Sequence, residues 1–307
     1  MTPQETNSRT PKRSCDASGG GDDRPTNAAC RSDERTRYEL QQAELERRAV
    51  QIAHQVLVLS GKGGVGKSTC AANLAYGFAD RRLTVGLLDA DLHGPTIPLM
   101  TGSVGARTSC GADGLLPIPV RPNLVTMSIS FLLEDAASPV IWRGPIRANV
   151  LRQFVAEVEW GPLDCLVVDL PPGTGDEPLT IAQAFPRADG AVIVTTPQEA
   201  SLATCRKAIN FVRAVGLPVL GVIENMSGFA CPHCGQETAI FTKGGGEAMA
   251  GEMGVPFLGR VPLAPEVVAL SDQGRFLLAD AGADAVREPF AAIVGTLMAR
   301  LRIAPVP

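Results

Sequence analysis

The sequence predicts an α/β fold in which a mostly parallel, doubly wound sheet carries helices on both faces. From residue 55 onward the sequence contains five short, nearly continuous apolar runs, at 55–60, 84–89, 165–170, 190–196 and 218–225. Such runs are typical of strands that are buried on both faces. Stretches with helical character lie between them, near 67–80, 145–159, 178–185 and 200–215. This alternation indicates one open sheet.

The residues before the first strand differ in composition from the rest. Residues 1–32 are rich in Gly, Ser, Asp and Arg and have almost no large apolar side chains. Such a segment buries too little surface to offset its ordering entropy, so we expect a disordered tail. Residues 33–53 are charged and rich in helix formers, which predicts a lead-in helix. We expect 54–307 to form one domain that contains the sheet.

Composition and charge limit the possible classes of function. The chain has 307 residues, of which 45% are hydrophobic, and this is enough for one large core or two small ones. Its net charge of −4 argues against a protein that coats nucleic acid. No membrane span or secretory signal is expected, because long apolar runs are missing from the sequence. We therefore expect a cytoplasmic protein whose eight cysteines are thiols or metal ligands.

The first predicted strand leads into the glycine-rich stretch SGKGGVGKST, residues 60–69. The pattern G-x-x-x-x-G-K-S between a strand and a helix is that of a phosphate-binding loop. Its glycines allow close approach of backbone N–H groups to phosphate oxygens. Lys67 is expected to reach the terminal phosphates, and the Ser68 hydroxyl is expected to bind Mg²⁺. The remaining loop residues expected to contact the nucleotide are Gly61, Lys62, Gly63, Gly64, Val65, Gly66 and Thr69.

Two further predicted strands end in aspartates. Asp89 ends the second run with Asp91 just after it, and Asp169 lies at the end of the third. The carboxyl ends of parallel strands form the ligand-binding edge of such a sheet. Asp169 occupies the position at which a carboxylate organises Mg²⁺. Gly173 and Gly175 follow it in a loop that can move when a γ-phosphate binds.

Cys231 and Cys234, in the stretch CPHC, place two thiolates where both can bind one metal centre. Two thiolates are half of a four-thiolate set, and a twofold dimer would supply the other half. An iron–sulfur cluster, a structural zinc and a redox dithiol all stay open on this pattern, with His233 expected to be an exposed loop residue. The other cysteines that follow the phosphate-binding loop in predicted helices or strands are expected to be buried small hydrophobic residues: Cys70, Cys165 and Cys205.

The form K-G-G-x-G-K-S, with Lys62 as its first lysine, resembles the deviant Walker A motif of the MinD, ParA and nitrogenase iron-protein class of P-loop ATPases. In that class the first lysine contacts the nucleotide bound to the partner subunit. The resemblance implies that Lys62 stabilises charge on the transferring phosphoryl group in trans, and that the chain works as a homodimer. It also implies that Asp91 positions the attacking water and that Asp89 supports it.

Several motifs between about residue 50 and residue 280 together resemble the Mrp/ApbC family of P-loop ATPases. The motifs are DLHGPTIP (91–98), VIWRGPIRANVLRQF (140–154), VVDLPPGTGDEPLT (167–180), VTTPQEASLATCRKAINF (194–211), GVIENMSGFACPHCG (221–235) and GGGEAMAGEMGVPFLGRVPLAP (244–265). Members of this family act as scaffolds or carriers of iron–sulfur clusters. The resemblance implies that Asn225 helps to recognise the adenine of ATP, since an amide at a strand end can pair with the base edge.

The same resemblance gives the CPHC stretch a function. It implies that Cys231 and Cys234 hold a 4Fe–4S cluster that bridges the dimer, and that the cluster passes to iron–sulfur apoproteins. The expected activity is slow, dimer-dependent hydrolysis of ATP with Mg²⁺. Some relatives carry an additional N-terminal site with four cysteines. Cys15 and Cys30 match its first pair, but no third or fourth cysteine follows, so we expect no stable cluster there.

Two other classes of function stay open. A positioning ATPase of the MinD or ParA type would bind membrane or DNA. However, the C-terminal stretch 289–302 has few basic residues, which predicts a core-packing helix, and that class gives no role to CPHC. The second alternative is a nucleotide switch with a zinc-bridged dimer. We favour the cluster carrier, with no nucleic-acid or membrane partner.

Overall fold

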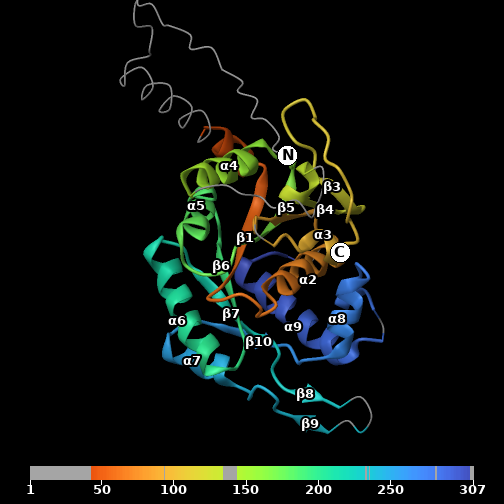
Figure 1. The fold of residues 1–307 in the computed structure, drawn as a ribbon, viewed down its shortest axis with the longest axis vertical. Coiled ribbons are helices and arrows are strands. Elements are labelled where there is room, and N and C mark those ends of the chain that lie inside the picture. The colour runs from red at the N-terminus through yellow and green to blue at the C-terminus, as the bar shows by residue number, and fades with distance from the viewer. Residues whose placement is uncertain are drawn as a thin grey trace, which may run out of the picture. The chain divides into compact units, whose positions relative to one another are not determined.

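An eight-stranded sheet forms the centre of the chain (Figure 1). The computed structural model describes residues 43–92, 94–133, 144–231, 234, 236–280 and 282–304, all of which belong to the unit Leu40–Pro307. The expected tail 1–32, with Cys15 and Cys30, lies outside the described residues, as does His233. The strands of the sheet are β1 (Ile52–Ser60), β2 (Val85–Asp89), β3 (Ile118–Arg121), β4 (Leu124–Ser128), β5 (Leu163–Asp169), β6 (Gly190–Thr195), β7 (Val219–Glu224) and β10 (Phe257–Arg260).

The strands lie in the order β10-β7-β6-β1-β5-β2-β4-β3, and all neighbours are parallel except β3 and β4. The first strand, β1, therefore lies between β5 and β6. From β1 the chain crosses to β2 on one side and later to β6 on the other, which makes the carboxyl end of β1 a switch point of the sheet. Ligands of open α/β sheets bind at such points. The predicted fold class, a doubly wound and mostly parallel sheet, is confirmed.

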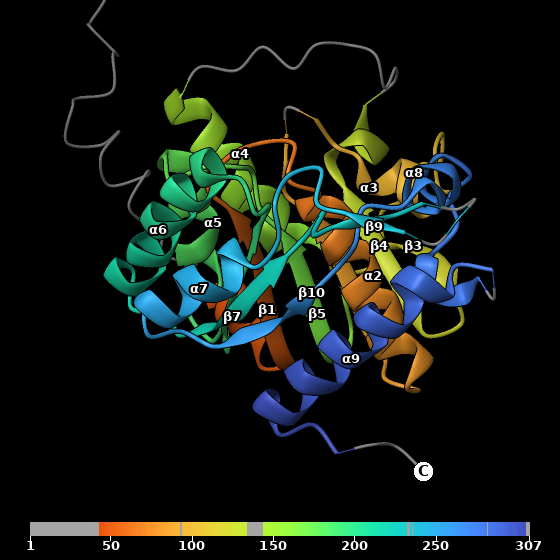
Figure 2. The same cartoon turned by 90° about the horizontal axis from the view of Figure 1, so that it is seen from below.

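Helices cover both faces of the sheet (Figure 2). The helices are α2 (Lys67–Asp80), α3 (Ile97–Met100), α4 (Gly144–Glu157), α5 (Asp176–Ala184), α6 (Glu199–Ala214), α7 (Gly245–Glu252), α8 (Pro265–Asp272) and α9 (Asp284–Leu301). Alternate residues of β1 pack into two different cores. Val56 and Val58 join the core with α2 and α9, whereas Leu57 and Leu59 join the core with α4, α5 and α6.

The boundary predicted between the lead-in helix and the first strand is wrong. The helix was expected to reach residue 53, but it ends at residue 49, and β1 already begins at Ile52. The reason lies in the neighbouring strand. Ile52 pairs with Leu163 of β5, and the Leu163 N–H donates to the Gln51 carbonyl at 3.0 Å. Strand pairing therefore takes the backbone groups that a longer helix would need.

Two predictions about buried residues are confirmed. The C-terminal stretch forms α9, and its buried side chains include Phe290, Ile293, Val294, Leu297 and Leu301. Cys70, Cys165 and Cys205 are also buried. Within the described part of the chain, no helix is long and apolar enough to cross a membrane.

Candidate nucleotide site and cysteine hairpin

The phosphate-binding loop joins β1 to α2 at the carboxyl edge of the sheet. Gly66 ends the loop with a left-handed backbone, φ 81°, directly before the first helical residue, Lys67. A Cβ on Gly66 would lie 2.1 Å from Nδ2 of Asn225, so a larger residue would displace this amide, and its backbone would be strained at this φ. The first turn of α2 contains no acidic residue. Its free N–H groups and helix dipole therefore remain available for an anion.

Lys67 and Asp169 form a buried ion pair beneath this loop. Lys67 Nζ lies 2.6 Å from Asp169 Oδ1, with 7% and 0% of the two side chains exposed. Burial raises the pKa of Asp169, while the Lys67 ammonium acts to lower it. The second carboxylate oxygen, Oδ2, is buried and has no hydrogen-bond partner among the described residues. A buried oxygen of this kind fits a hydrated Mg²⁺, which prefers oxygen ligands.

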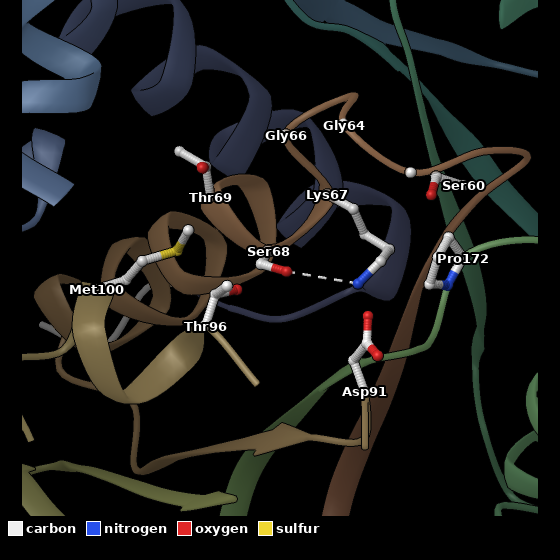
Figure 3. A pocket seen from close by; sticks show the side chains of 11 residues that line it. Ser60, Gly64, Gly66, Lys67, Ser68, Thr69, Asp91, Thr96, Met100 and Pro172 are labelled. Carbon is white, nitrogen blue, oxygen red and sulfur yellow. Dashed lines mark hydrogen bonds between the residues drawn. The ribbon is translucent and has the colours of Figure 1, made fainter. Parts of the chain in front are cut away.

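Ser68, Lys67 and Asp91 converge on one cavity (Figure 3). Lys67 Nζ lies 3.5 Å from the Ser68 hydroxyl, and the Asp91 carboxylate points toward the same space from the β2 side. Four lining residues were missed by the sequence analysis: Ser60, Thr96, Met100 and Pro172. Thr96 could have been predicted to lie near the cavity, because it belongs to the motif DLHGPTIP and lies five residues after Asp91.

Asp89, unlike Asp91, is not among the described residues that line this cavity. It ends β2 directly opposite Asp169 of β5 and is fully buried. Its carboxylate accepts hydrogen bonds from the Asp91 N–H at 3.2 Å, the Ile97 N–H at 3.2 Å and the Ser128 hydroxyl at 3.3 Å. Burial, with the Asp169 carboxylate nearby, raises the pKa of Asp89 well above its usual value. Asp89 thus shapes the loop that carries Asp91.

A second, more apolar cavity adjoins the first and shares Gly66, Thr69 and Met100 with it. Its other lining residues are Asn225, Met226, Pro262, Leu263, Ala264, Val267, Val268, Ser271 and Asp272. Asn225 connects the two cavities, because its Nδ2 also donates to the Val65 carbonyl of the phosphate-binding loop at 2.8 Å. The resemblance predicted that this amide contacts the adenine, but not that it holds the loop.

Lys62 is half-buried, and its carbonyl accepts a hydrogen bond from the Ser60 hydroxyl at 2.9 Å. Among the described residues, the lining of the phosphate cavity includes Gly63, Gly64 and Lys67 but not Lys62. Its side chain therefore does not belong to the wall of the cavity in its own chain.

The cysteine pair lies on a separate antiparallel hairpin of β8 (Phe229–Ala230) and β9 (Glu237–Thr238), away from the main sheet (Figure 1). Cys231 is half-buried and Cys234 is exposed. The Cys231 N–H donates to the Gln236 carbonyl at 3.0 Å, which closes the turn that carries both thiols. In the part of the chain that the structure describes, no group of three or more His, Cys, Asp or Glu residues is placed to hold a metal.

The comparison with known proteins identifies the family. A family model described as ParA, NUBPL iron-transfer P-loop NTPase, matches residues 51–298. The chain belongs to this family. The resemblance that its motifs predicted is therefore confirmed, and the chain is a NUBPL-type P-loop NTPase.

Curated relatives of this NUBPL-type NTPase have names that refer to iron–sulfur clusters. The chain is 49% identical over 234 residues to an iron-sulfur cluster carrier protein of Methanocaldococcus jannaschii, covering 76% of this chain and 81% of the relative. It is 48% identical over 260 residues to a cytosolic Fe-S cluster assembly factor, NUBP2 homolog, of Monosiga brevicollis, covering 84% and 92%.

Solved structures agree with this family. The chain is 39% identical to a nucleotide-binding protein of Archaeoglobus fulgidus in complex with ADP, with a TM-score of 0.68, covering 76% of this chain and 92% of that protein. It also shares its fold with the MinD cell division protein of Aquifex aeolicus, at 18% identity and a TM-score of 0.59, covering 83% and 99%.

Proposed function

We propose that this protein is a cytoplasmic, homodimeric ATPase that assembles a 4Fe–4S cluster between its subunits and transfers it to apoproteins. The observation that carries the proposal is the contrast between two sites in one chain. The nucleotide site has a phosphate-binding loop, a cation and carboxylates together. The cysteine hairpin, by contrast, offers two thiols on a projecting turn. The names of the two relatives, an iron-sulfur cluster carrier protein and an Fe-S cluster assembly factor, support the same function.

The nucleotide phosphates are bound by the N–H groups of the loop and of the first turn of α2, next to the Lys67 ammonium. Ser68 and Asp169 are the residues that would hold Mg²⁺, since Oδ2 of Asp169 has no hydrogen-bond partner among the described residues. When bound, Mg²⁺ would neutralise part of the negative charge on the β- and γ-phosphates. The Asn225 amide holds the loop and borders the cavity proposed for the adenine.

Hydrolysis needs a positioned water and a second cation. Asp91 orients the attacking water from the end of β2, and Asp89 holds the backbone of Asp91 in place. Lys62 of the partner subunit stabilises the negative charge that develops on the transferring phosphoryl group. Because its side chain does not line its own cavity, a role in trans explains why this loop contains a second lysine.

The cluster is the cargo of this protein. Cys231 and Cys234 of two subunits together provide the four thiolates that a 4Fe–4S cluster requires. A cluster held by two thiolates from each chain lies at a boundary between subunits. The exposure of Cys234 then allows thiolates of an acceptor protein to replace the ligands one at a time.

Iron and acid-labile sulfide analysis of the anaerobically reconstituted protein tests the proposal. We expect about four iron atoms per dimer. Replacement of Cys231→Ala or Cys234→Ala should remove the iron and leave ATP binding intact. Cys110→Ala is the matched control, because Cys110 is exposed but lies outside the hairpin. Stoichiometric zinc that survives reconstitution without uptake of iron would contradict the carrier function and favour a zinc-bridged nucleotide switch.

A further inference from the structure

Glu224 closes the base of the cysteine hairpin. This residue ends β7, and its side chain is fully buried. Its carboxylate accepts hydrogen bonds from the Ser227 hydroxyl, from the Gly246 N–H and, at 2.9 Å, from the Gly244 N–H. Ser227 lies before the hairpin, and the two glycines lie after it. One carboxylate therefore ties the entry and the exit of the hairpin together.

On the exit side of the hairpin, the start of α7 binds the Glu224 carboxylate through backbone N–H groups. Gly244 precedes α7 with a left-handed backbone, φ 87°, and has no side chain of its own to cap the helix. Backbone N–H groups at such a helix start form a site for an anion, and here Glu224 fills it. A Cβ on Gly246 would lie 2.9 Å from Glu224 Oε2, so glycine allows the close approach. Arg260 adds a cation, with its Nε 3.7 Å from the carboxylate.

The same segment is also part of the nucleotide site. Asn225, next to Glu224, donates to the Val65 carbonyl of the phosphate-binding loop. Met226 lines the apolar cavity with a left-handed backbone, φ 55°. This conformation is unusual for a residue with a side chain. It separates Asn225, which contacts the loop, from Ser227, which contacts Glu224.

Backbone pairing extends this connection. The Ser227 N–H donates to the Val261 carbonyl at 2.9 Å, and the Leu263 N–H donates to the Gly228 carbonyl at 2.8 Å. Leu263 and the adjacent Pro262 line the apolar cavity. The wall of this cavity and the start of the hairpin are therefore paired segments of one small backbone ladder.

We propose that Glu224 is a positioning residue that couples occupancy of the nucleotide cavity to the placement of the Cys231–Cys234 hairpin. A nucleotide that contacts Asn225, Met226 or Leu263 shifts the backbone ladder at the hairpin entry. Because Glu224 ties the entry to the exit, the shift moves the hairpin as a unit and changes the surroundings of both thiols. The inference rests on the proposed function in one respect, namely that this cavity binds nucleotide.

The test measures thiol reactivity in the full-length, reduced protein without iron. A short pulse of N-ethylmaleimide is followed by peptide-resolved mass spectrometry of Cys231 and Cys234, with and without saturating Mg·ADP. In the wild type we expect ADP to change the labelling rate by about fivefold or more, a typical coupling between two sites. In Glu224→Gln the labelling ratio should fall to about one while ADP still binds, since the amide nitrogen cannot accept from the donors that the carboxylate binds.

Glu252→Gln is the matched control. It removes a carboxylate from the end of α7, but Glu252 is exposed and bonds Arg206 of α6, which is not among the partners of Glu224. This variant should keep the wild-type ratio. A role of Glu224 in stability alone would lower the melting temperature and leave the ADP-dependent ratio unchanged, and that result would overturn the proposal. A wild-type protein that binds ADP without any change in labelling would also overturn it.

Ser227→Ala tests the coupling between the nucleotide cavity and the hairpin if Glu224→Gln does not fold or does not bind ADP. It removes one donor and leaves the carboxylate in place. Bound ADP with a reduced labelling ratio would support the coupling, whereas an unchanged ratio would overturn it. Neither measurement requires iron. A failure to bind a cluster would therefore refute the proposed function and leave the result on coupling standing.

Discussion

Lys67 lies next to buried carboxylates, and its ammonium partly neutralises their charge. Asp169 contacts its ammonium at 2.6 Å, and Asp89 lies opposite Asp169 on the neighbouring strand. The ammonium acts to lower the pKa of both carboxyl groups, against the opposing effect of burial. A neutral residue at position 67 would therefore leave buried acidic groups without their cation, and would also remove the cation that we propose binds the phosphates.

We predict that Lys67→Ala weakens ADP binding by about 10- to 100-fold, because charge-assisted hydrogen bonds to phosphate are lost. Calorimetric titration with Mg·ADP measures this change. Lys207→Ala, which alters an exposed lysine on α6, is the control and should bind normally. An affinity within twofold of the wild type in Lys67→Ala would show that the lysine does not contact the phosphates.

The cysteines differ in ionisation as well as in position. Burial raises the pKa of Cys70 and of Cys205 to about 12, from 9.0. Both thiols stay protonated in the pH range in which an unfolded cysteine ionises. Since the unfolded chain loses these protons first, the folded state also loses stability as the pH rises above 9.0.

We therefore predict that iodoacetamide labels Cys234 in the folded protein but spares Cys70 and Cys205, even at about pH 10, because the thiolate is the reactive form. Peptide mass spectrometry with and without urea distinguishes the sites. Urea should make all three react. Rapid labelling of Cys70 in the folded protein would contradict its burial.

At the scale of elements, α9 supports the helix that begins with Lys67. Its apolar face packs in the same core as α2. The contact is close, since a Cβ on Gly77 of α2 would lie 2.6 Å from Cγ2 of Val294. Leu297 is completely buried in this core. None of the described residues that line the two cavities at the phosphate-binding loop comes from α9.

We predict that Leu297→Ala lowers the free energy of unfolding by about 2–5 kcal/mol, because it leaves a cavity in the core. Urea denaturation measures this change, and ADP affinity should stay the same. The neighbouring Thr296 is exposed, so Thr296→Ala should change stability by about 0.5 kcal/mol or less. A similar small loss in Leu297→Ala would mean that α9 is not a core helix in solution.

At the scale of the whole molecule, the role proposed for Lys62 would connect catalysis to assembly. We predict that Lys62→Ala keeps its affinity for ADP but loses most of its ATP hydrolysis, because the proposed target of the lysine is in the partner subunit. Asp91→Ala should also be inactive. Mixing the two variants creates dimers in which one site has both residues, and ATP hydrolysis by the mixture should recover in part. If both variants dimerise and no activity returns, Lys62 does not act in trans.

Much of the fold follows from local patterns. The apolar runs of β1, β2, β5, β6 and β7 are nearly continuous and bounded by helical stretches, so their hydrophobicity predicts both their conformation and their burial. The phosphate-binding loop and Asp169 are predictable for a related reason, since the loop directly follows such a run and Asp169 lies at the end of one. Six further elements were not predicted, because they are short and give weak periodic signals: β3, β4, β10, α3, α7 and α8.

Contacts between distant segments depend on the order of the strands. Lys67 meets Asp169 because β5 lies beside β1, and Asn225 reaches Val65 because β7 ends at the same edge as the loop. Glu224 was part of a family motif, yet its two-sided contact with Ser227 and Gly246 exists because the chain leaves the sheet and returns to it. Local residue patterns reflect the burial and backbone preferences of neighbouring residues. The partners of a buried charge come from segments that only the packed sheet brings together.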